Sequence, residues 1–290
     1  MFWYTDFPFL LSILFFFLLG TIVGSFLNVV VLRYEKGEQA VAGRSHCMAC
    51  NKTLAWYELI PIFSYIFQLG KCRGCKAKLS IQYPLVELGT GILFVLILVH
   101  FSPYPYTFPY AFTSSYPYPY PYPYLALHLA IWSLFMVITV YDSRTKLIPN
   151  RFSYTLAGLA FMSMFIEQGN IVMPSLSHIL AGPALFLPFY TLWKVSDGRW
   201  IGLGDGKLAL GIGWFLGLAE GGTAILFAFW IGAGVSVLVI FLQKLMRQRT
   251  GGGSKESALT LKSEIPFGPY LVLGTLIVYI MHFNMYAYLL

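Results

Sequence analysis

Residues 8–32 read PFLLSILFFFLLGTIVGSFLNVVVL and contain no Asp, Glu, Lys or Arg. A helix needs about 20 apolar residues to cross the hydrocarbon core of a bilayer, so this stretch predicts a membrane-spanning helix. The residues before it include Asp6 but no basic residue, whereas a secretory signal begins with basic residues. We therefore expect this first span to be retained rather than cleaved.

Seven further apolar runs follow the first, at 85–100, 125–141, 150–166, 175–193, 208–218, 223–243 and 267–289. The chain has 290 residues, of which 58% are hydrophobic and 11% are charged. Soluble domains carry about a quarter charged residues, so this composition excludes a soluble enzyme, a disordered tail and a secreted disulfide-rich scaffold. It predicts an all-α polytopic membrane protein with about eight transmembrane helices.

All 19 Lys and Arg residues lie in alternate connections between these runs, at 33–83, 142–151, 194–207 and 244–266. Basic connections stay on the cytoplasmic side of a membrane. We therefore expect these four connections in the cytoplasm and both termini outside. The net charge of +7 is then a topology signal, so membrane lipid with its anionic headgroups is the expected partner and nucleic acid is not.

A low-complexity tract of Pro and Tyr occupies 101–124, in a connection predicted to lie outside. Alternating Pro prevents a helix and favours extended polyproline geometry, and Tyr suits the lipid–water interface. We interpret this outer loop as a spacer, with a binding role as the alternative.

The four cysteines form two Cys-x-x-Cys pairs in the first cytoplasmic connection, with 21 residues between the pairs. Two pairs of thiolates complete the tetrahedral coordination of Zn²⁺, so the spacing predicts a structural zinc site in a small zinc-ribbon-like insert. Disulfides are an alternative that a reducing cytosol disfavours, and a redox pair would need thioredoxin-like surroundings. The predicted ligands are Cys47, Cys50, Cys72 and Cys75.

The stretch between the two cysteine pairs, LAWYELIPIFSYIFQL at 54–69, is apolar enough to suggest a ninth span. A crossing here would place the pairs on opposite sides of the membrane, where they could not share a metal ion. The stretch also contains Glu58, Pro61 and Gln68. We therefore expect it to lie at the bilayer surface.

Two aspartates lie at one face of the membrane in the predicted topology. Asp142 ends the third run in VYDSRTKLIPN, and Asp205 precedes the sixth run in GLGDGKL. Two carboxyl groups in contact share one proton, so one acts as general base on water and the other as general acid, which is aspartic-protease chemistry. Alternatively, each Asp caps a helix or pairs with a nearby Lys. Glycines of the second motif would let the backbone approach a substrate strand: Gly202, Gly204 and Gly206.

The motifs together resemble those of bacterial type IV prepilin peptidases, which are GxGD-type aspartic proteases. The matching stretches are GSFLNVVVLRY (24–34), RSHCMAC, KCRGCKAKLSIQYPLVELGTG, YDSRTKLIPN, GLGDGKL and EIPFGPYL (264–271). The resemblance implies cleavage of type IV prepilins and type II secretion pseudopilins after a leader Gly, at the cytoplasmic face of the bacterial inner membrane. It implies that Asp142 and Asp205 are the catalytic dyad and that the active-site loop contains Gly202, Gly204, Gly206 and Lys207.

The same resemblance implies a second activity, N-methylation of the new N-terminal residue with S-adenosyl-L-methionine as methyl donor. The family's WYENIP and GKC stretches occur here as WYELIP and GKC. Glu58, Gly70 and Lys71 are therefore implicated in methyl transfer. The sequence departs from the family pattern at three positions, where the family has Pro, Asn and Asp: Met48, Leu59 and Asn150. A peptidase without methyltransferase activity is therefore an alternative.

The resemblance divides the chain into a first transmembrane helix (1–32), a zinc-binding and methyl-transfer insert (33–83) and a transmembrane protease domain (84–290). Two other functions fit some of the same residues. A proton-coupled transporter would use intramembrane carboxylates as a relay, but would show inverted repeats that we do not find in this sequence. A non-enzymatic scaffold would use the insert to recruit secretion components and would tolerate Asp-to-Asn changes at 142 and 205.

Overall fold

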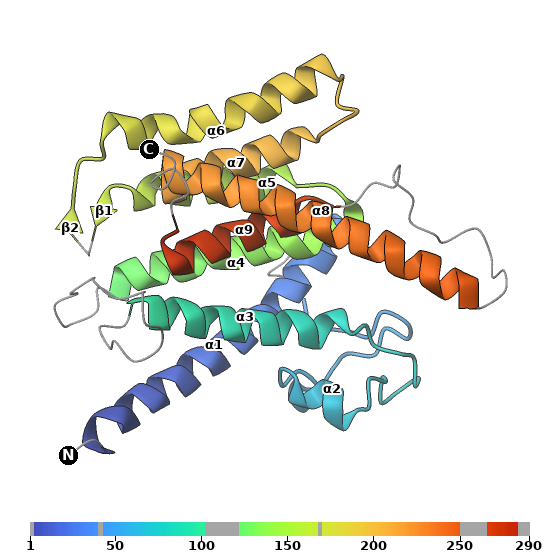
Figure 1. Cartoon of the computed structure of the whole chain (residues 1–290). Coiled ribbons are helices and arrows are strands. Elements are labelled where there is room, and N and C mark those ends of the chain that lie inside the picture. The colour runs from blue at the N-terminus through green and yellow to red at the C-terminus, as the bar shows by residue number, and fades with distance from the viewer. Residues whose placement is uncertain (1–2, 40–42, 102–121, 168–169, 250–265, 284–290) are drawn as a thin grey trace. The chain divides into compact units, whose positions relative to one another are not determined.

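The computed structural model describes residues 3–39, 43–101, 122–167, 170–249 and 266–283. Most of the Pro/Tyr-rich tract lies outside the described residues. The eight predicted apolar runs each form one helix (Figure 1), which confirms the all-α membrane fold. These helices are α1 (Trp3–Glu35), α3 (Gln82–Phe101), α4 (Tyr122–Thr145), α5 (Asn150–Ser163), α6 (Leu176–Val195), α7 (Leu203–Leu216), α8 (Leu218–Arg249) and α9 (Gly268–Met281).

Five helices of the described chain are long and apolar enough to cross a membrane, namely Phe9–Glu35, Gln82–Phe101, Pro123–Thr145, Leu176–Val195 and Leu218–Gln243. The other three, α5, α7 and α9, have 14 residues each. Their length is about 21 Å, which is less than the hydrocarbon thickness of about 30 Å.

A turn residue marks one end of each of these three helices. Pro149 is the residue before α5, where its missing N–H and fixed φ favour a helix start. Gly217 ends α7 with a φ of +81°, and His282 ends α9 with a φ of +49°. A left-handed residue terminates a helix in the ordinary way.

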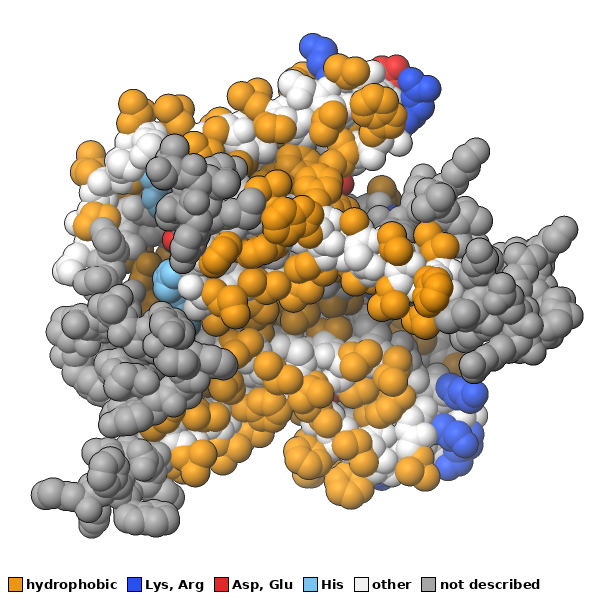
Figure 2. Space-filling model, viewed as in Figure 1, with side chains coloured by type: hydrophobic (Ala, Val, Ile, Leu, Met, Phe, Trp, Pro, Cys, Tyr) orange, Lys and Arg blue, Asp and Glu red, His pale blue; other side chains and the backbone are white. Residues whose placement is uncertain are grey.

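Apolar side chains cover the outer surfaces of the helices. Figure 2 shows hydrophobic side chains over the helices of one face, with Lys and Arg side chains beyond the end of α6 and in the insert. Leu14, Phe15 and Ile22 of α1 are each more than half exposed. Exposed apolar patches of this kind mark a membrane-facing surface.

The chain forms two compact units, Met1–Val140 and Tyr141–Leu290. In the second unit α7 is the central helix and packs against α5, α6, α8 and α9. An antiparallel pair of strands, β1 (Ile166–Glu167) and β2 (Asn170–Ile171), lies between α5 and α6 in the chain. The core of this unit consists of aliphatic and small side chains: Leu156, Ala160, Leu208, Ile212, Ala224, Leu271 and Val278.

In the first unit, α1 and α3 pack closely through glycines. A Cβ at Gly20 would lie 2.7 Å from the Thr90 carbonyl oxygen, and one at Gly24 would lie 2.8 Å from the Cα of Glu87. Two small residues four positions apart permit this backbone approach between membrane helices. The two glycines therefore serve helix packing.

The insert between α1 and α3 contains two short helical segments, η1 (Trp56–Glu58) and α2 (Phe63–Phe67). Because α2 has five residues and is about 7.5 Å long, the apolar stretch does not form a ninth span. Its largest apolar side chains are exposed, Trp56 at 77%, Phe67 at 76% and Leu69 at 84%. Such side chains suit the interfacial position that we expect for this stretch.

Candidate active site and metal centre

Asp142 lies three residues before the end of α4 and is 4% exposed. Its Oδ2 accepts a hydrogen bond of 2.9 Å from the backbone N–H of Gly268, the first residue of α9. The first N–H groups of a helix have no partner within the helix, so this donor is free to bind a carboxylate. The sequence motif EIPFGPYL carried no assigned role, and Gly268 is a site residue that sequence reasoning missed. A Gly-Pro pair at the start of an apolar run was the available signal for a helix start here.

Asp205 lies in the first turn of α7, where the helix dipole favours a negative charge. Its N–H donates to the carbonyl of Gly202, which is the N-cap residue. The carboxyl groups of Asp142 and Asp205 are close enough to interact electrostatically. The structure therefore brings together the two aspartates that the topology predicted to meet.

The helix-cap alternative does not describe either aspartate. Gly202, not Asp205, caps α7, and Asp142 lies near a helix C-terminus, where a negative charge is unfavourable. The nearby Lys207 does not pair with either carboxylate. Its ammonium donates to Asn150 Oδ1 at 2.6 Å and lies 5.4 Å from the centre of the Tyr154 ring.

The three glycines of the GLGDGK stretch differ in their surroundings. A Cβ at Gly204 would lie 2.8 Å from the Cβ of Ile148, and one at Gly206 would lie 3.1 Å from the Cβ of Phe189. Both glycines thus serve packing within the unit. Gly202 is exposed. Of the three glycines, it is therefore the one whose backbone a substrate strand could approach.

The two Cys-x-x-Cys pairs form two turns with the same backbone geometry. In the first, Cys47 N–H donates to the Lys52 carbonyl and His46 pairs with Thr53; in the second, Cys72 N–H donates to the Ala77 carbonyl and Lys71 pairs with Lys78. The residue after each second cysteine has a positive φ, 56° at Asn51 and 60° at Lys76. The sequence between the pairs thus folds so that both turns present their thiols to one point.

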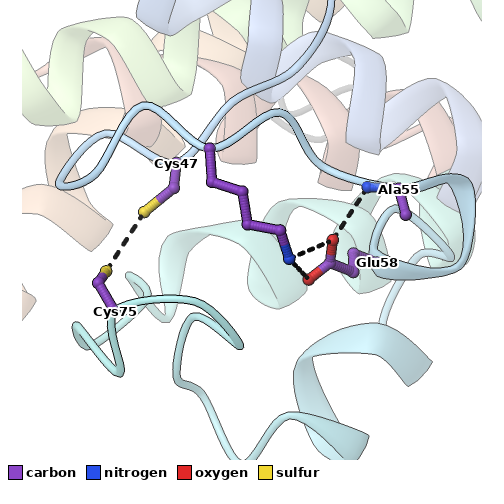
Figure 3. Close-up of polar contacts among 5 residues, drawn as sticks. Cys47, Ala55, Glu58 and Cys75 are labelled. Atoms are coloured by element: carbon purple, nitrogen blue, oxygen red, sulfur yellow. Dashed lines mark hydrogen bonds and ion pairs between the residues drawn. The ribbon is translucent and has the colours of Figure 1, made fainter.

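The four thiol groups lie within 4.8 Å of one another, and the Cys47 and Cys75 sulfurs are 3.9 Å apart (Figure 3). A disulfide requires about 2.05 Å, whereas sulfurs around a tetrahedral ion with bonds of about 2.3 Å lie about 3.8 Å apart. Backbone N–H groups of Cys75 and Gly74 lower the pKa of the Cys72 thiol to about 6, which favours the thiolate that binds metal. This cluster can hold a metal ion.

Glu58 turns its carboxyl group inward, where it is fully buried (Figure 3). It accepts the Ala55 N–H at 2.9 Å and pairs with the Lys52 ammonium at 3.2 Å. The hydrogen bond from Ala55, followed by the contact with Lys52, lowers the pKa of the Glu58 carboxyl. Because Lys52 follows the first cysteine pair, Glu58 ties the η1 loop to the first cysteine turn.

Gly70 and Lys71 lie at the start of the second cysteine turn. Gly70 has a φ of +65°, and its carbonyl accepts the Leu79 N–H at 2.8 Å. A side chain at this position would be strained and would meet the Tyr65 hydroxyl at 3.0 Å. The Lys71 side chain is exposed, in contrast to the buried carboxyl of Glu58.

Two family models match the chain and together cover most of it. Residues 18–101 match the bacterial peptidase A24 N-terminal domain, and residues 129–237 match the type IV leader peptidase family. The chain belongs to the type IV leader peptidase family. The second match includes Asp142 and Asp205, and the first includes all four cysteines. The predicted family and the predicted peptidase activity are confirmed, and the transporter alternative is not favoured.

Named relatives of this family are similar along most of their length. A prepilin leader peptidase/N-methyltransferase of Myxococcus xanthus is 34% identical over 250 residues, which are 84% of this chain and 68% of the relative. The enzyme of the same name from Bacillus subtilis is 30% identical over 274 residues, 93% of this chain and 94% of the relative. No solved structure matches the chain.

Proposed function

We propose that this leader peptidase cleaves type IV prepilins and type II secretion pseudopilins after the leader Gly and then methylates the new N-terminal amine. The observation that carries the peptidase activity is the juxtaposition of Asp142 and Asp205 at the ends of apolar helices, with Gly268 holding Asp142. The names of the relatives support both the substrate class and the second activity.

Cleavage requires a base and an acid, and the two aspartates supply both. One carboxylate removes a proton from water as the water oxygen attacks the scissile carbonyl carbon. The other carboxyl group then gives its proton to the leaving nitrogen, and the carbon–nitrogen bond breaks. The two carboxyl groups share one proton, so the roles of base and acid belong to the pair of Asp142 and Asp205.

The proposed location is the bacterial inner membrane, with the dyad and the insert on the cytoplasmic side. The segregation of all 19 Lys and Arg residues into alternate connections supports this orientation. A basic prepilin leader would then meet anionic headgroups while its apolar helix lies in the bilayer next to the dyad.

The insert is the proposed site of methyl transfer, with Zn²⁺ as the structural metal of the four-cysteine cluster and S-adenosyl-L-methionine as methyl donor. Four thiolates in a reducing compartment favour zinc. When bound, S-adenosyl-L-methionine would supply the methyl group for the new N-terminal amine, whose proton would pass to solvent. Glu58, Gly70 and Lys71 are the proposed residues of this site.

The decisive experiment is cleavage of a precursor with a basic leader ending in Gly before a Phe-led apolar helix. Purified protein in membranes, Asp142→Asn and Asp205→Asn would be compared by intact product mass with the methyl donor present. Loss of cleavage in both variants, with a methylated wild-type product, is the expected result. Equal cleavage by all three would overturn the aspartic mechanism, and an unmethylated product would leave a peptidase alone.

A further inference from the structure

The loop between η1 and α2 contains a rare backbone conformation. Phe63 N–H donates to the Pro61 carbonyl at 2.6 Å, which closes a three-residue γ-turn around Ile62. Ile62 has a φ of +64° and a ψ of −55°. This form of γ-turn is strained, and a positive φ at a β-branched residue is an outlier that the surrounding structure must impose.

Glu87 of α3 is the residue that stabilises this turn from outside. Its side chain is buried, 7% exposed, and its Oε2 accepts the Ile62 N–H at 2.7 Å. The Ser25 hydroxyl of α1 bonds to the same carboxyl group. The turn's own hydrogen bond does not use the Ile62 N–H, so Glu87 satisfies a donor and at the same time anchors the loop to the helix pair α1–α3.

The anchored turn lies between the residues proposed for methyl transfer. Ile62 is four positions after Glu58, whose carboxyl group is tied to the first cysteine turn through Lys52. α2 then leads from the turn to Gly70, whose carbonyl is bonded to Leu79. The segment is therefore fixed to the metal centre at both ends and to the transmembrane helices at its middle.

We propose that Glu87 is a positioning residue for methyl transfer, which it supports by holding the Ile62 turn and thereby the segment from Glu58 to Lys71 against the α1–α3 pair. The inference rests on the proposed methyl transfer in this insert. The proposal concerns methyl transfer alone, and cleavage by Asp142 and Asp205 serves as the reference activity.

The test compares Glu87→Leu, which removes the acceptor, with Glu87→Gln, whose amide oxygen still accepts the Ile62 N–H. Cleavage and methylation of one precursor are measured in the same full-length samples, so cleavage reports the amount of folded enzyme. We expect kcat/KM for methylation to fall about tenfold in Glu87→Leu, with cleavage changed less than about twofold. Glu87→Gln should keep most of the methylation, and Glu38→Leu, at an exposed carboxylate before the first cysteine turn, should match wild type.

A second variant tests whether Glu87 acts through the turn. Glycine adopts positive φ without strain, so Ile62→Gly should restore much of the methylation when added to Glu87→Leu. Methylation by Glu87→Leu at the wild-type rate would overturn the proposal, as would equal loss of both activities without rescue by Ile62→Gly. A wild-type product that is cleaved but never methylated would instead overturn the proposed methyl transfer itself, and this inference with it.

Discussion

Gly268 donates its backbone N–H to Oδ2 of Asp142 across 126 positions of sequence, and the hydrogen bond is 2.9 Å long. The contact joins the start of α9 to the end of α4 at the dyad. A Cβ at position 268 would lie 2.8 Å from the same oxygen. Glycine is therefore required here by the closeness of the carboxylate, not by the backbone conformation.

Gly268→Ala is expected to lower kcat for prepilin cleavage about 10- to 100-fold, because the added methyl group must displace a catalytic carboxylate. Alanine favours the helix itself, so the yield of folded protein should not fall. Gly158→Ala in α5 is the matched control, since a Cβ there meets nothing within 4 Å. A full cleavage rate in Gly268→Ala would show that this contact does not position Asp142.

Replacing one thiol should remove the metal and the second activity while sparing the first. Cys72→Ser is expected to lose the bound zinc, because three thiolates bind it more weakly than four. Elemental analysis and the two assays on one precursor would measure this, with methylation lost and cleavage kept. Met48→Ala is the control on the same turn, where the side chain is half exposed and is not a ligand. Retention of a full equivalent of metal by Cys72→Ser would contradict the four-cysteine site.

Glu58 and Lys52 should contribute unequally to the order of the η1 loop. Glu58→Leu removes the buried acceptor of the Ala55 N–H, whereas Lys52→Gln removes an ammonium whose side chain is 43% exposed. Exposed partners of ion pairs contribute little. We expect hydrogen exchange at the Ala55 amide to accelerate clearly in Glu58→Leu and slightly in Lys52→Gln. The reverse order would show that the ammonium, not the Ala55 hydrogen bond, holds the carboxyl group.

The packing of α1 on α3 should be sensitive to one methyl group. Gly24→Ala places a Cβ 2.8 Å from the Cα of Glu87, and overpacking of this kind costs about 1–3 kcal/mol. We expect a lower apparent unfolding temperature in nanodiscs. Gly89→Ala on the same helix pair is the comparison, because its Cβ would meet the flexible end of Met136 at 3.5 Å. Equal stability of the two variants would show that the contact between α1 and α3 accommodates a methyl group at position 24 without loss of stability.

The sequence alone was sufficient to predict the eight helices, the two cysteine turns and the meeting of Asp142 with Asp205. These features depend on local properties: the length of an apolar run, the spacing of Cys-x-x-Cys, and the alternation of basic connections. The helix lengths were less predictable. Hydropathy alone does not mark helix ends: the runs at 150–166 and 267–289 are longer than α5 and α9, whereas the run at 208–218 is shorter than α7.

Only the tertiary structure decided which residues support the predicted ones. Gly268 donates a hydrogen bond to Asp142, and Ile62 donates one to Glu87, because particular helix ends and loops pack together. Neither the spacing of apolar residues nor a sequence motif predicts such a pairing. Packing also decided that Gly204 and Gly206 face Ile148 and Phe189. The physical reason is that a helix forms from short-range backbone hydrogen bonds and from the transfer of its apolar side chains into the bilayer. A site, in contrast, is assembled by contacts between residues far apart in the chain.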